Sequence, residues 1–335
     1  PHGLAYRQQR LILTGKLGPA WVFVGRERSR LGPATSGGLL LSGTTPFDGL
    51  TLGLDSPIRL PGIARHLGPF LATLLVTRIP ADSLGPGEFL AAARVAFAPH
   101  PRIQLGLNRS ALVLAQVDGR NIGLADLLYI AVGKHTDADF ENQLASIDLR
   151  ARVDLRGWPV VVYIELGTED SAGAFTEDPG LILGLFLPIL PGLPAVSLRY
   201  EYTAFGPDAF FCVSCDGKAR NWYRHRTASG HRAVYANADG VPFGHPLGGY
   251  GHEHLLQARA WPAAARLRLA ASLRARNREP LNLLFEQRPG PSRAAALEAA
   301  YRLKPHLDLE ARAAAEWGSA GWSEHLLWLA LRAFF

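Results

Sequence analysis

Apolar and polar residues alternate along most of this chain from residue 88 onward. Residues 147–154 read Ile-Asp-Leu-Arg-Ala-Arg-Val-Asp, and leucine or alanine holds the odd positions of 266–276 while arginine or serine holds most of the even ones. Successive side chains of a β-strand point to opposite faces. The alternation therefore predicts strands that have one apolar and one polar face.

The strands that this pattern predicts are long. Several run for nine to eleven residues, whereas strands in soluble proteins are most often about five or six residues long. A soluble β-sandwich with a solvated charged face is the alternative explanation for any single strand. Because about nine to eleven residues let a tilted strand cross a bilayer, the length favours a transmembrane β-barrel.

Short and long connections alternate along the same stretch. The predicted short turns lie at 99–101, 156–158, 188–194, 262 and 304–305, and the longer loops between them lie at 114–143, 168–180, 204–253, 278–292 and 318–324. Outer-membrane barrels join their strands by short periplasmic turns and longer extracellular loops. A sandwich with Greek-key crossings has no reason to keep this order.

The composition agrees with a barrel. The 35 glycines and 24 prolines supply turns, and a net charge of +6 (35 basic minus 29 acidic residues) accompanies a mean hydropathy of +0.05. An apolar face toward lipid and an arginine-rich interior average to such a value. The most apolar segment, 181–198, contains three prolines, so no spanning helix is predicted.

The pattern predicts a single antiparallel barrel domain over residues 1–335, with short helices in the loops or the lumen. About fifteen strands are visible, near 5–14, 20–28, 49–56, 70–79, 88–97, 102–113, 144–155, 159–167, 181–187, 195–203, 254–261, 265–277, 293–303, 306–317 and 325–335. Bacterial single-chain barrels have even strand numbers, so we expect about 16–18 strands in total and one or more N-terminal strands missing here. The last strand ends in Phe335, which resembles the terminal segment of bacterial outer-membrane proteins.

The polar faces of these strands, which a barrel turns toward its lumen, are rich in arginine. The arginines expected to face inward are Arg94, Arg102, Arg150, Arg152, Arg199, Arg259, Arg266, Arg268, Arg274, Arg276, Arg302, Arg312 and Arg332, and the acids are Asp148, Asp154, Glu165, Glu201, Glu298, Asp308, Glu310 and Glu316. One interpretation is that they pair across neighbouring strands. The other is a cationic lumen that selects an anionic sugar, because arginine matches carboxylate and phosphate groups. Both can hold together.

The long loop at 204–253 is aromatic and basic. Aromatic rings stack on the apolar C–H faces of sugars while polar side chains bind the hydroxyl groups; an interfacial aromatic girdle or ordinary loop packing is the alternative. The candidate polysaccharide-binding residues are Trp222, Tyr223, Arg224, His225, Arg226, Tyr235 and Tyr250 from this loop, and Arg150, Arg152 and Arg199 from the lumen.

Two further loop features are open to interpretation. The apolar stretch at 121–132 predicts a helix that Asn121 could cap, and this segment could plug the lumen, cover the extracellular rim or form another strand. Cys212 and Cys215 indicate a local disulfide more than a redox motif, because no βαβ pattern surrounds them.

Signals for catalysis and metal binding are weak. His252 and His254 could share a strand face, but no further ligand follows at fixed spacing. Glu165 and Glu201 could act as a glycosidase pair, although structural ion pairs explain them more simply. No nucleotide-binding or nucleophile motif is present. We therefore expect no cofactor, no metal, no nucleic-acid partner and no enzymatic activity.

A set of short motifs runs through most of the chain. They are Leu31-Gly32-Pro33, Gly37-Gly38-Leu39-Leu40-Leu41-Ser42 with Pro46, Leu67-Gly68-Pro69-Phe70, Phe140-Glu141-Asn142-Gln143-Leu144-Ala145 with Asp148, Glu165 with Glu169-Asp170, Arg199-Tyr200-Glu201-Tyr202, and Gly244-His245-Pro246-Leu247-Gly248. In these motifs the chain resembles the Wzi family of outer-membrane capsule assembly proteins, which attach capsular polysaccharide to the cell surface. It departs in lacking the N-terminal part, and in Leu31 and Gly38, where tryptophan and serine are typical.

The resemblance implies a monomeric barrel, closed by helices and loops, that binds exported capsule without catalysis. We therefore expect a protein of the bacterial outer membrane whose partners are capsular or other extracellular polysaccharide and membrane lipid. A porin or channel for anionic solutes is the alternative, and an outer-membrane enzyme acting on glycan or lipid is a third hypothesis.

Overall fold

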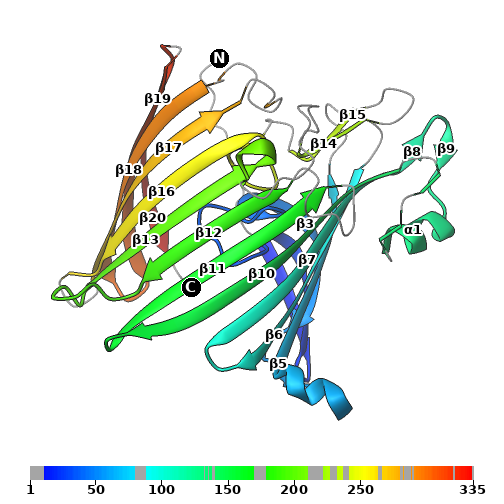
Figure 1. The fold of residues 1–335 in the computed structure, drawn as a ribbon, viewed down its shortest axis with the longest axis horizontal. Coiled ribbons are helices and arrows are strands. Elements are labelled where there is room, and N and C mark those ends of the chain that lie inside the picture. Colours follow the sequence, from blue (N-terminus) through cyan, green and yellow to red (C-terminus); the bar gives the residue numbers. More distant parts are fainter. Residues whose placement is uncertain are drawn as a thin grey trace.

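One antiparallel sheet makes up most of the molecule (Figure 1). The computed structural model describes residues 11–79, 88–131, 133–134, 136–137, 140–169, 179–209, 222–226, 232–236, 241–262, 266–279, 282, 288, 290–319 and 321–333. No helix in these segments is long and apolar enough to cross a membrane.

The sheet follows the order of the chain. Its strands are β1 (Leu11–Leu17), β2 (Ala20–Arg30), β3 (Ser42–Leu54), β5 (Pro69–Ile79), β6 (Glu88–His100), β7 (Ile103–Leu114), β10 (Glu141–Leu155), β11 (Trp158–Glu169), β12 (Gly180–Leu187), β13 (Val196–Phe205), β16 (Gly251–Ala260), β17 (Leu267–Arg278), β18 (Gly290–Lys304), β19 (Leu307–Gly318) and β20 (Ser323–Ala333). Each pairs with the next, and the two-residue strand β4 (Ile58–Arg59) also pairs with β5 to complete a 16-stranded sheet. Every strand predicted from the alternation is confirmed within the described residues; residues 5–10 of the first prediction and 334–335 of the last lie outside them.

Smaller elements lie in the connections. They are the hairpins β8 (Gln116–Val117) with β9 (Arg120–Asn121) and β14 (Arg224–Arg226) with β15 (Arg232–Val234), the helix α1 (Leu124–Ala131), and the 3-10 helices η1 (Gly62–Leu67) and η2 (Gly206–Asp208). The hairpins and α1 lie beyond the same end of the sheet (Figure 1). We call it the long-loop end and the opposite end the short-turn end.

The turn between β10 and β11 shows how the short connections form. Leu155 pairs with Trp158, so only Arg156 and Gly157 make the turn. Both have positive φ, 51° and 87°, as a type I′ hairpin turn requires, and glycine adopts that conformation without strain. The predicted short turn is thus confirmed.

The outer face of the sheet is apolar. On β20, Leu327, Leu329 and Leu331 are 85%, 70% and 63% exposed, and on β10 the exposed apolar residues Ile147 and Leu149 again lie two positions apart. The row on β10 loses no hydrogen bond in lipid, because β10 pairs with β7 on one side and β11 on the other. The alternation therefore places an apolar surface on the outside, as in a membrane barrel.

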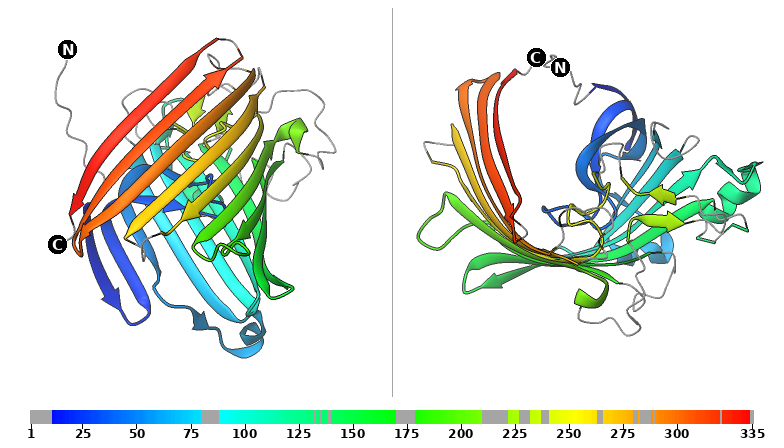
Figure 2. Two further views of the ribbon diagram at one scale, coloured as in Figure 1. Left: turned by 90° about the vertical axis from the view of Figure 1, so that its left-hand side faces the viewer. Right: turned by 90° about the horizontal axis from the view of Figure 1, so that it is seen from above.

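The sheet curls around other segments of the same chain, which lie inside it (Figure 2). Within the described residues, β1 pairs only with β2 and β20 only with β19. β1 and β20 run in the same direction, so direct pairing between them would be parallel, unlike every other pair in the sheet. The expectation of an even strand number stays a prediction.

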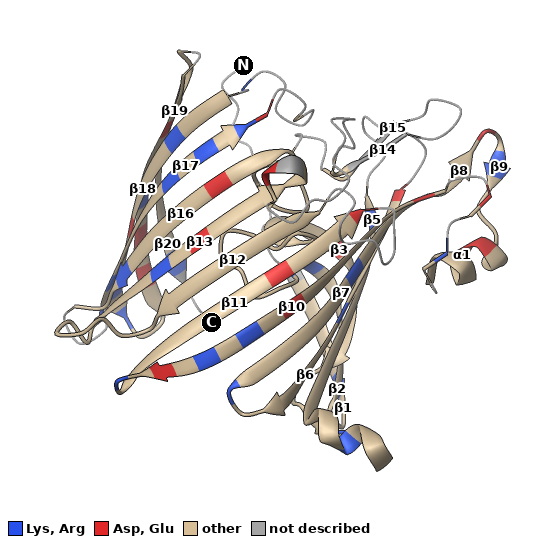
Figure 3. Ribbon diagram, viewed as in Figure 1, with Lys and Arg blue, Asp and Glu red and all other residues tan. Residues whose placement is uncertain are grey.

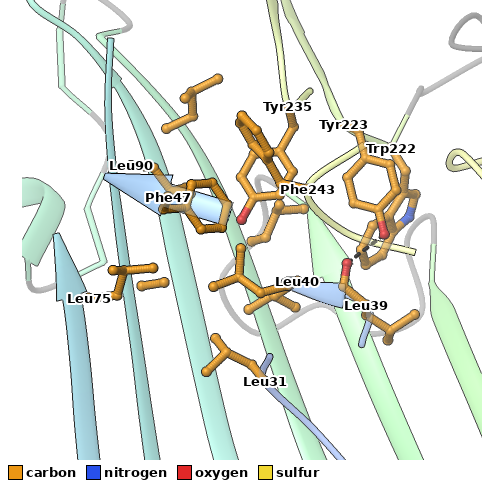
Figure 4. Packing of buried hydrophobic residues seen from close by; sticks show 14 of the residues in the cluster. Leu31, Leu39, Leu40, Phe47, Leu75, Leu90, Trp222, Tyr223, Tyr235 and Phe243 are labelled. Atoms are coloured by element: carbon orange, nitrogen blue, oxygen red, sulfur yellow. Dashed lines mark hydrogen bonds between the residues drawn. The ribbon is translucent and has the colours of Figure 1, made fainter. Parts of the chain in front are cut away.

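A buried hydrophobic cluster occupies the inside of the barrel at the long-loop end. It contains Leu39, Leu40 and Leu41, which follow β2 and are 0% exposed, together with aromatic residues of the connection between β13 and β16 (Figure 4). We name residues 31–41 the inner segment and residues 206–250 the long loop.

Candidate functional site

Buried carboxylates on the barrel wall hold the inner segment in place. Glu201 on β13 accepts hydrogen bonds from the backbone N–H groups of Thr35 and Ser36, each at 2.7 Å, and from the Tyr163 hydroxyl. Its side chain is buried. Bonds of backbone N–H groups to a carboxylate are charge-assisted, so Glu201 fastens the inner segment to the wall instead of lining an open passage.

Gly38 lets the inner segment fold back on itself. Leu31 N–H donates to Leu41 O at 3.1 Å, which closes the segment into a loop. A Cβ atom at Gly38 would lie 1.9 Å from the Leu31 carbonyl oxygen. The two backbone segments of this chain therefore approach so closely that a side chain at position 38 would force one of them to shift.

Aromatic rings cross the interior from β13 to β3. The Phe205 and Trp222 centroids are 5.0 Å apart, Tyr223 stacks on Tyr235 at 5.6 Å, and Phe243 joins Tyr235 at 5.3 Å. Phe243 also contacts a ring on β3, Phe47, at 5.1 Å. All six rings are buried and most are visible in Figure 4. The cluster therefore fills the barrel at this level.

Tyr223 joins the long loop to the inner segment. Its hydroxyl donates to Leu39 O and accepts from His245 N–H at 2.8 Å, and its own N–H donates to Glu169 at 3.1 Å. Burial raises the pKa of the Tyr223 hydroxyl well above its usual value, so it stays protonated and keeps donating.

His245 in the long loop is a neutral, fully buried histidine. Leu247 N–H donates to Nδ1 at 3.1 Å, so the ring proton lies on Nε2, which is 3.2 Å from Ser36 Oγ and 3.3 Å from Thr203 Oγ1. Burial lowers the pKa of His245 to about 4, although Glu253 opposes this shift from 4.0 Å away. His245 thus links the long loop to the inner segment and to β13 without a charge.

Charge pairing across strands is confirmed for the lumen. The ion pairs include Arg94 with Asp148 (2.5 Å), Arg102 with Asp154 (2.9 Å), Arg268 with Asp308 (2.7 Å), Arg276 with Glu316 (2.9 Å), Arg312 with Glu298 (3.3 Å) and Arg332 with Glu310 (2.9 Å). Figure 3 shows the charged residues along the strands. The charges are more exposed toward the short-turn end, as in the pair of Arg102 and Asp154, and more buried near the inner segment.

The structure separates the ten candidate binding residues into groups. Trp222, Tyr223, Tyr235 and Tyr250 are buried, so their rings pack the interior in this conformation. The backbone of Arg224, His225 and Arg226 forms β14 at the long-loop rim (Figure 1).

The three lumen candidates lie away from that rim. Arg150 and Arg152 are exposed in the short-turn half of β10, where Arg152 is 3.5 Å from Asp154. Arg199 lies over the Phe186 ring at 4.4 Å and 3.8 Å from Glu201. These residues therefore do not form one continuous site with β14.

Sequence reasoning missed the residues that close the interior. Glu169, Glu201 and His245 were not assigned this task, and the inner segment was not assigned a location. Two signals were available. One was the glycine-rich context of Gly37-Gly38 and of 244–249, which is typical of tight backbone approaches; the other was that these three residues and both ends of the inner segment lie in the short motifs that run through the chain.

The two histidines of β16 lie on the outer wall. His252 Nδ1 is 3.1 Å from Asp208, and His254 Nδ1 is 2.8 Å from the Tyr200 hydroxyl. Within the described segments no group of three or more His, Cys, Asp or Glu residues could hold a metal ion. Cys212 and Cys215 lie outside the described residues.

The comparisons with known proteins agree with this architecture. The family model described as "Capsule assembly protein Wzi" matches residues 13–324. The structure of Wzi from Escherichia coli, described as a carbohydrate-binding β-barrel involved in group 1 capsule assembly, is similar with a TM-score of 0.73 at 18% identity; the match covers 92% of this chain and 66% of that one. This chain thus spans slightly less than two thirds of that protein.

Two barrels of Pseudomonas aeruginosa are also similar in fold. OccK5 (OpdH) has a TM-score of 0.51 at 11% identity, covering 98% of this chain and 82% of that chain. OpdK with vanillate has a TM-score of 0.51 at 12% identity, covering 97% and 77%. The search of curated proteins finds no match.

Proposed function

Because the chain belongs to the family of Wzi capsule assembly proteins, we propose that it binds capsular polysaccharide at the cell surface and helps to hold it there. It is an outer-membrane β-barrel, so the long-loop end faces outward from the cell. The E. coli relative is described as a carbohydrate-binding barrel in capsule assembly, which supports the same role here. We propose further that the protein is monomeric and acts without catalysis.

One observation carries this proposal: the interior of the barrel is packed at the long-loop end. The ring cluster from Phe205 to Phe47 and the inner segment are buried there. A polymer strand is much wider than the gaps in a close-packed interior. Polysaccharide outside the cell would therefore meet the outer surface of this packed region and the loops above it.

The hairpin of β14 and β15 is the surface that we propose for polysaccharide. It contains Arg224, His225, Arg226 and Arg232, and the buried rings lie directly beside it in the chain. Tyr235 N–H donates to Tyr223 O at 2.8 Å across the base of the hairpin. The buried aromatic residues would then contribute to polysaccharide binding indirectly, because they hold the basic hairpin at the rim; they are Trp222, Tyr223, Tyr235 and Tyr250.

A channel for anionic solutes is the second candidate, because exposed arginines such as Arg150 and Arg268 line the short-turn half of the lumen. Conductance across a planar bilayer separates the two functions. A packed interior predicts no steady current, together with retention of capsular polysaccharide by the immobilised protein. Steady open current with no retention would support the channel instead.

Charge-removing variants locate the binding surface. Replacing Arg224, Arg226 and Arg232 with glutamine should weaken binding of an acidic capsular polysaccharide about tenfold, because three charge contacts to the polymer at roughly 0.5 kcal/mol each are lost. Added salt should weaken wild-type binding in the same way. The matched variant Arg150→Gln/Arg152→Gln should bind normally. Loss of binding in that variant alone would show that the polymer enters the lumen and would overturn the rim site.

A further inference from the structure

Helix α1 packs against the outer wall of the barrel, not inside it. Arg109 on the outward face of β7 donates to the carbonyl oxygens of Ile130 and Ala131 at the C-terminal end of the helix, the latter at 3.1 Å. Ala111 and Val113, two and four residues further along β7, are buried against Ile130. Figure 2 shows this region outside the curled sheet in the view from above.

The chain after α1 is also fastened to the outer wall. Thr136 N–H donates to Glu141 at 2.9 Å, and the Gln143 side-chain amide donates to Lys134 O at 2.9 Å. Glu141 and Gln143 both belong to β10 and alternate with the inward residues Asn142 and Leu144. These bonds fix the position of the helix relative to the barrel.

The other face of α1 is apolar and uncovered. Half of the eight residues of the helix are large side chains that are exposed: Leu124 (75%), Leu127 (46%), Leu128 (59%) and Tyr129 (50%). Its acidic residue, Asp126, is buried, where it accepts from Gly123 N–H at 2.9 Å and from Arg120 at 2.8 Å. The exposed side thus presents apolar side chains without a carboxylate.

This face continues the lipid-facing surface of the barrel. Below α1, the outward residues Leu107 on β7 and Ile147 on β10 are exposed and lie opposite each other. The next outward position on β7 is Arg109, at which the helix begins to cover the strand. The helix therefore sits where the apolar belt ends, which is the level of the lipid headgroups.

A cation lies beside the apolar face. Lys134 Nζ is 5.8 Å from the centre of the Tyr129 ring. Tyrosine and lysine together suit the membrane interface, where a ring is half in lipid and an ammonium group meets phosphate.

We infer that α1 is an interfacial helix whose Leu124, Leu127, Leu128 and Tyr129 side chains insert into the outer leaflet of the membrane while Lys134 contacts lipid phosphate. The occupant of this surface is membrane lipid. The helix would set the height of the barrel in the membrane and keep the long-loop rim above the headgroups. This role does not depend on polysaccharide binding.

Site-directed labelling of the full chain in vesicles tests the inference. In a background of Cys212→Ser and Cys215→Ser, a nitroxide is attached to Leu128→Cys, and its accessibility to oxygen and to a water-soluble nickel chelate is measured in phosphatidylcholine vesicles. Leu107→Cys on the lipid-facing wall and Gln116→Cys at an exposed position of β8 are the matched controls. Heat-modifiable migration on gels confirms that each variant has folded.

The label at Leu128→Cys should resemble that at Leu107→Cys, with oxygen accessibility several-fold above and chelate accessibility several-fold below the values at Gln116→Cys. Adding phosphatidylglycerol should deepen the label, and Lys134→Glu should reverse that deepening. If the Leu128→Cys label is as accessible to the chelate as that at Gln116→Cys, the helix is in water and the inference fails. A label that is wet in vesicles but immobilised on whole cells would instead reveal a protein partner, and this outcome also overturns it.

Discussion

Replacing Glu201 with alanine should release the inner segment from the barrel wall. The Glu201 carboxylate accepts backbone N–H bonds from Thr35 and Ser36 at 2.7 Å each. A hydrogen bond to a charged group contributes about 1.5–3 kcal/mol, so the two bonds together contribute about 3–6 kcal/mol. Water that enters the space left by the side chain offsets part of this loss.

The expected result is faster local opening of the inner segment while the barrel stays folded. Since about 1.4 kcal/mol is a factor of ten, amide hydrogen exchange at Thr35 and Ser36 should accelerate at least about a hundredfold in Glu201→Ala. Mass spectrometry of peptides covering 31–41, after exchange in detergent micelles, measures this rate. Brief current bursts in planar bilayers, absent from the wild type, would be a second sign of opening.

A matched control is Glu298→Ala, which removes another carboxylate from the lumen wall. Glu298 is 52% exposed and pairs with Arg312 at 3.3 Å; an exposed pair of this kind contributes only about 0–1 kcal/mol. Exchange in the inner segment should not change in this variant. Equal exchange rates in Glu201→Ala and the wild type would refute the conclusion that Glu201 anchors the segment.

Two further experiments probe the packed interior. Gly38→Ala should destabilise the inner segment by about 1–3 kcal/mol, because its Cβ meets the Leu31 carbonyl oxygen at 1.9 Å. Amide hydrogen exchange over 31–41 measures this loss. The control Gly123→Ala should be neutral, because the atom nearest to its Cβ lies at 3.4 Å. Acidification should loosen the long loop: the pKa of His245 falls from 6.5 to about 4 on burial, so the open form binds the extra proton and stability is lost as pH falls from about 6.5 to 4, by up to roughly 3 kcal/mol. Limited proteolysis across this pH range should show the change, and His245→Gln should flatten it; equal pH dependence in both proteins would contradict this assignment.

The strands and their faces could be predicted because they depend on local pattern. In β17, arginines alternate with leucines, and a strand must then place the two types on opposite sides whatever surrounds it. The turn at Arg156 and Gly157 follows from two residues between two such runs. The lumen ion pairs follow as well, since charges on neighbouring inward faces come within reach of each other.

Burial of the loop residues could not be predicted in the same way. Trp222, Tyr223 and Tyr235 have the composition of a sugar-binding surface, yet the structure buries them against Leu39 and Phe243. The same aromatic ring suits either role, because it has a large apolar body and, in tyrosine and tryptophan, one polar group. Which role it takes depends on the wall that surrounds it.

The sequence by itself therefore determined the barrel, the orientation of each strand face and the family, since these rest on periods of two residues and on short motifs. Only the tertiary structure decided that residues 31–41 lie inside the barrel while 124–131 lie outside it. Both are apolar segments next to long strands, and both bury leucine or isoleucine. Residues 31–41 are held inside by hydrogen bonds to Glu201 and Tyr223, whereas residues 124–131 are held outside by Arg109 on the outer wall. Contacts between residues so far apart in the chain form only once the sheet has curled.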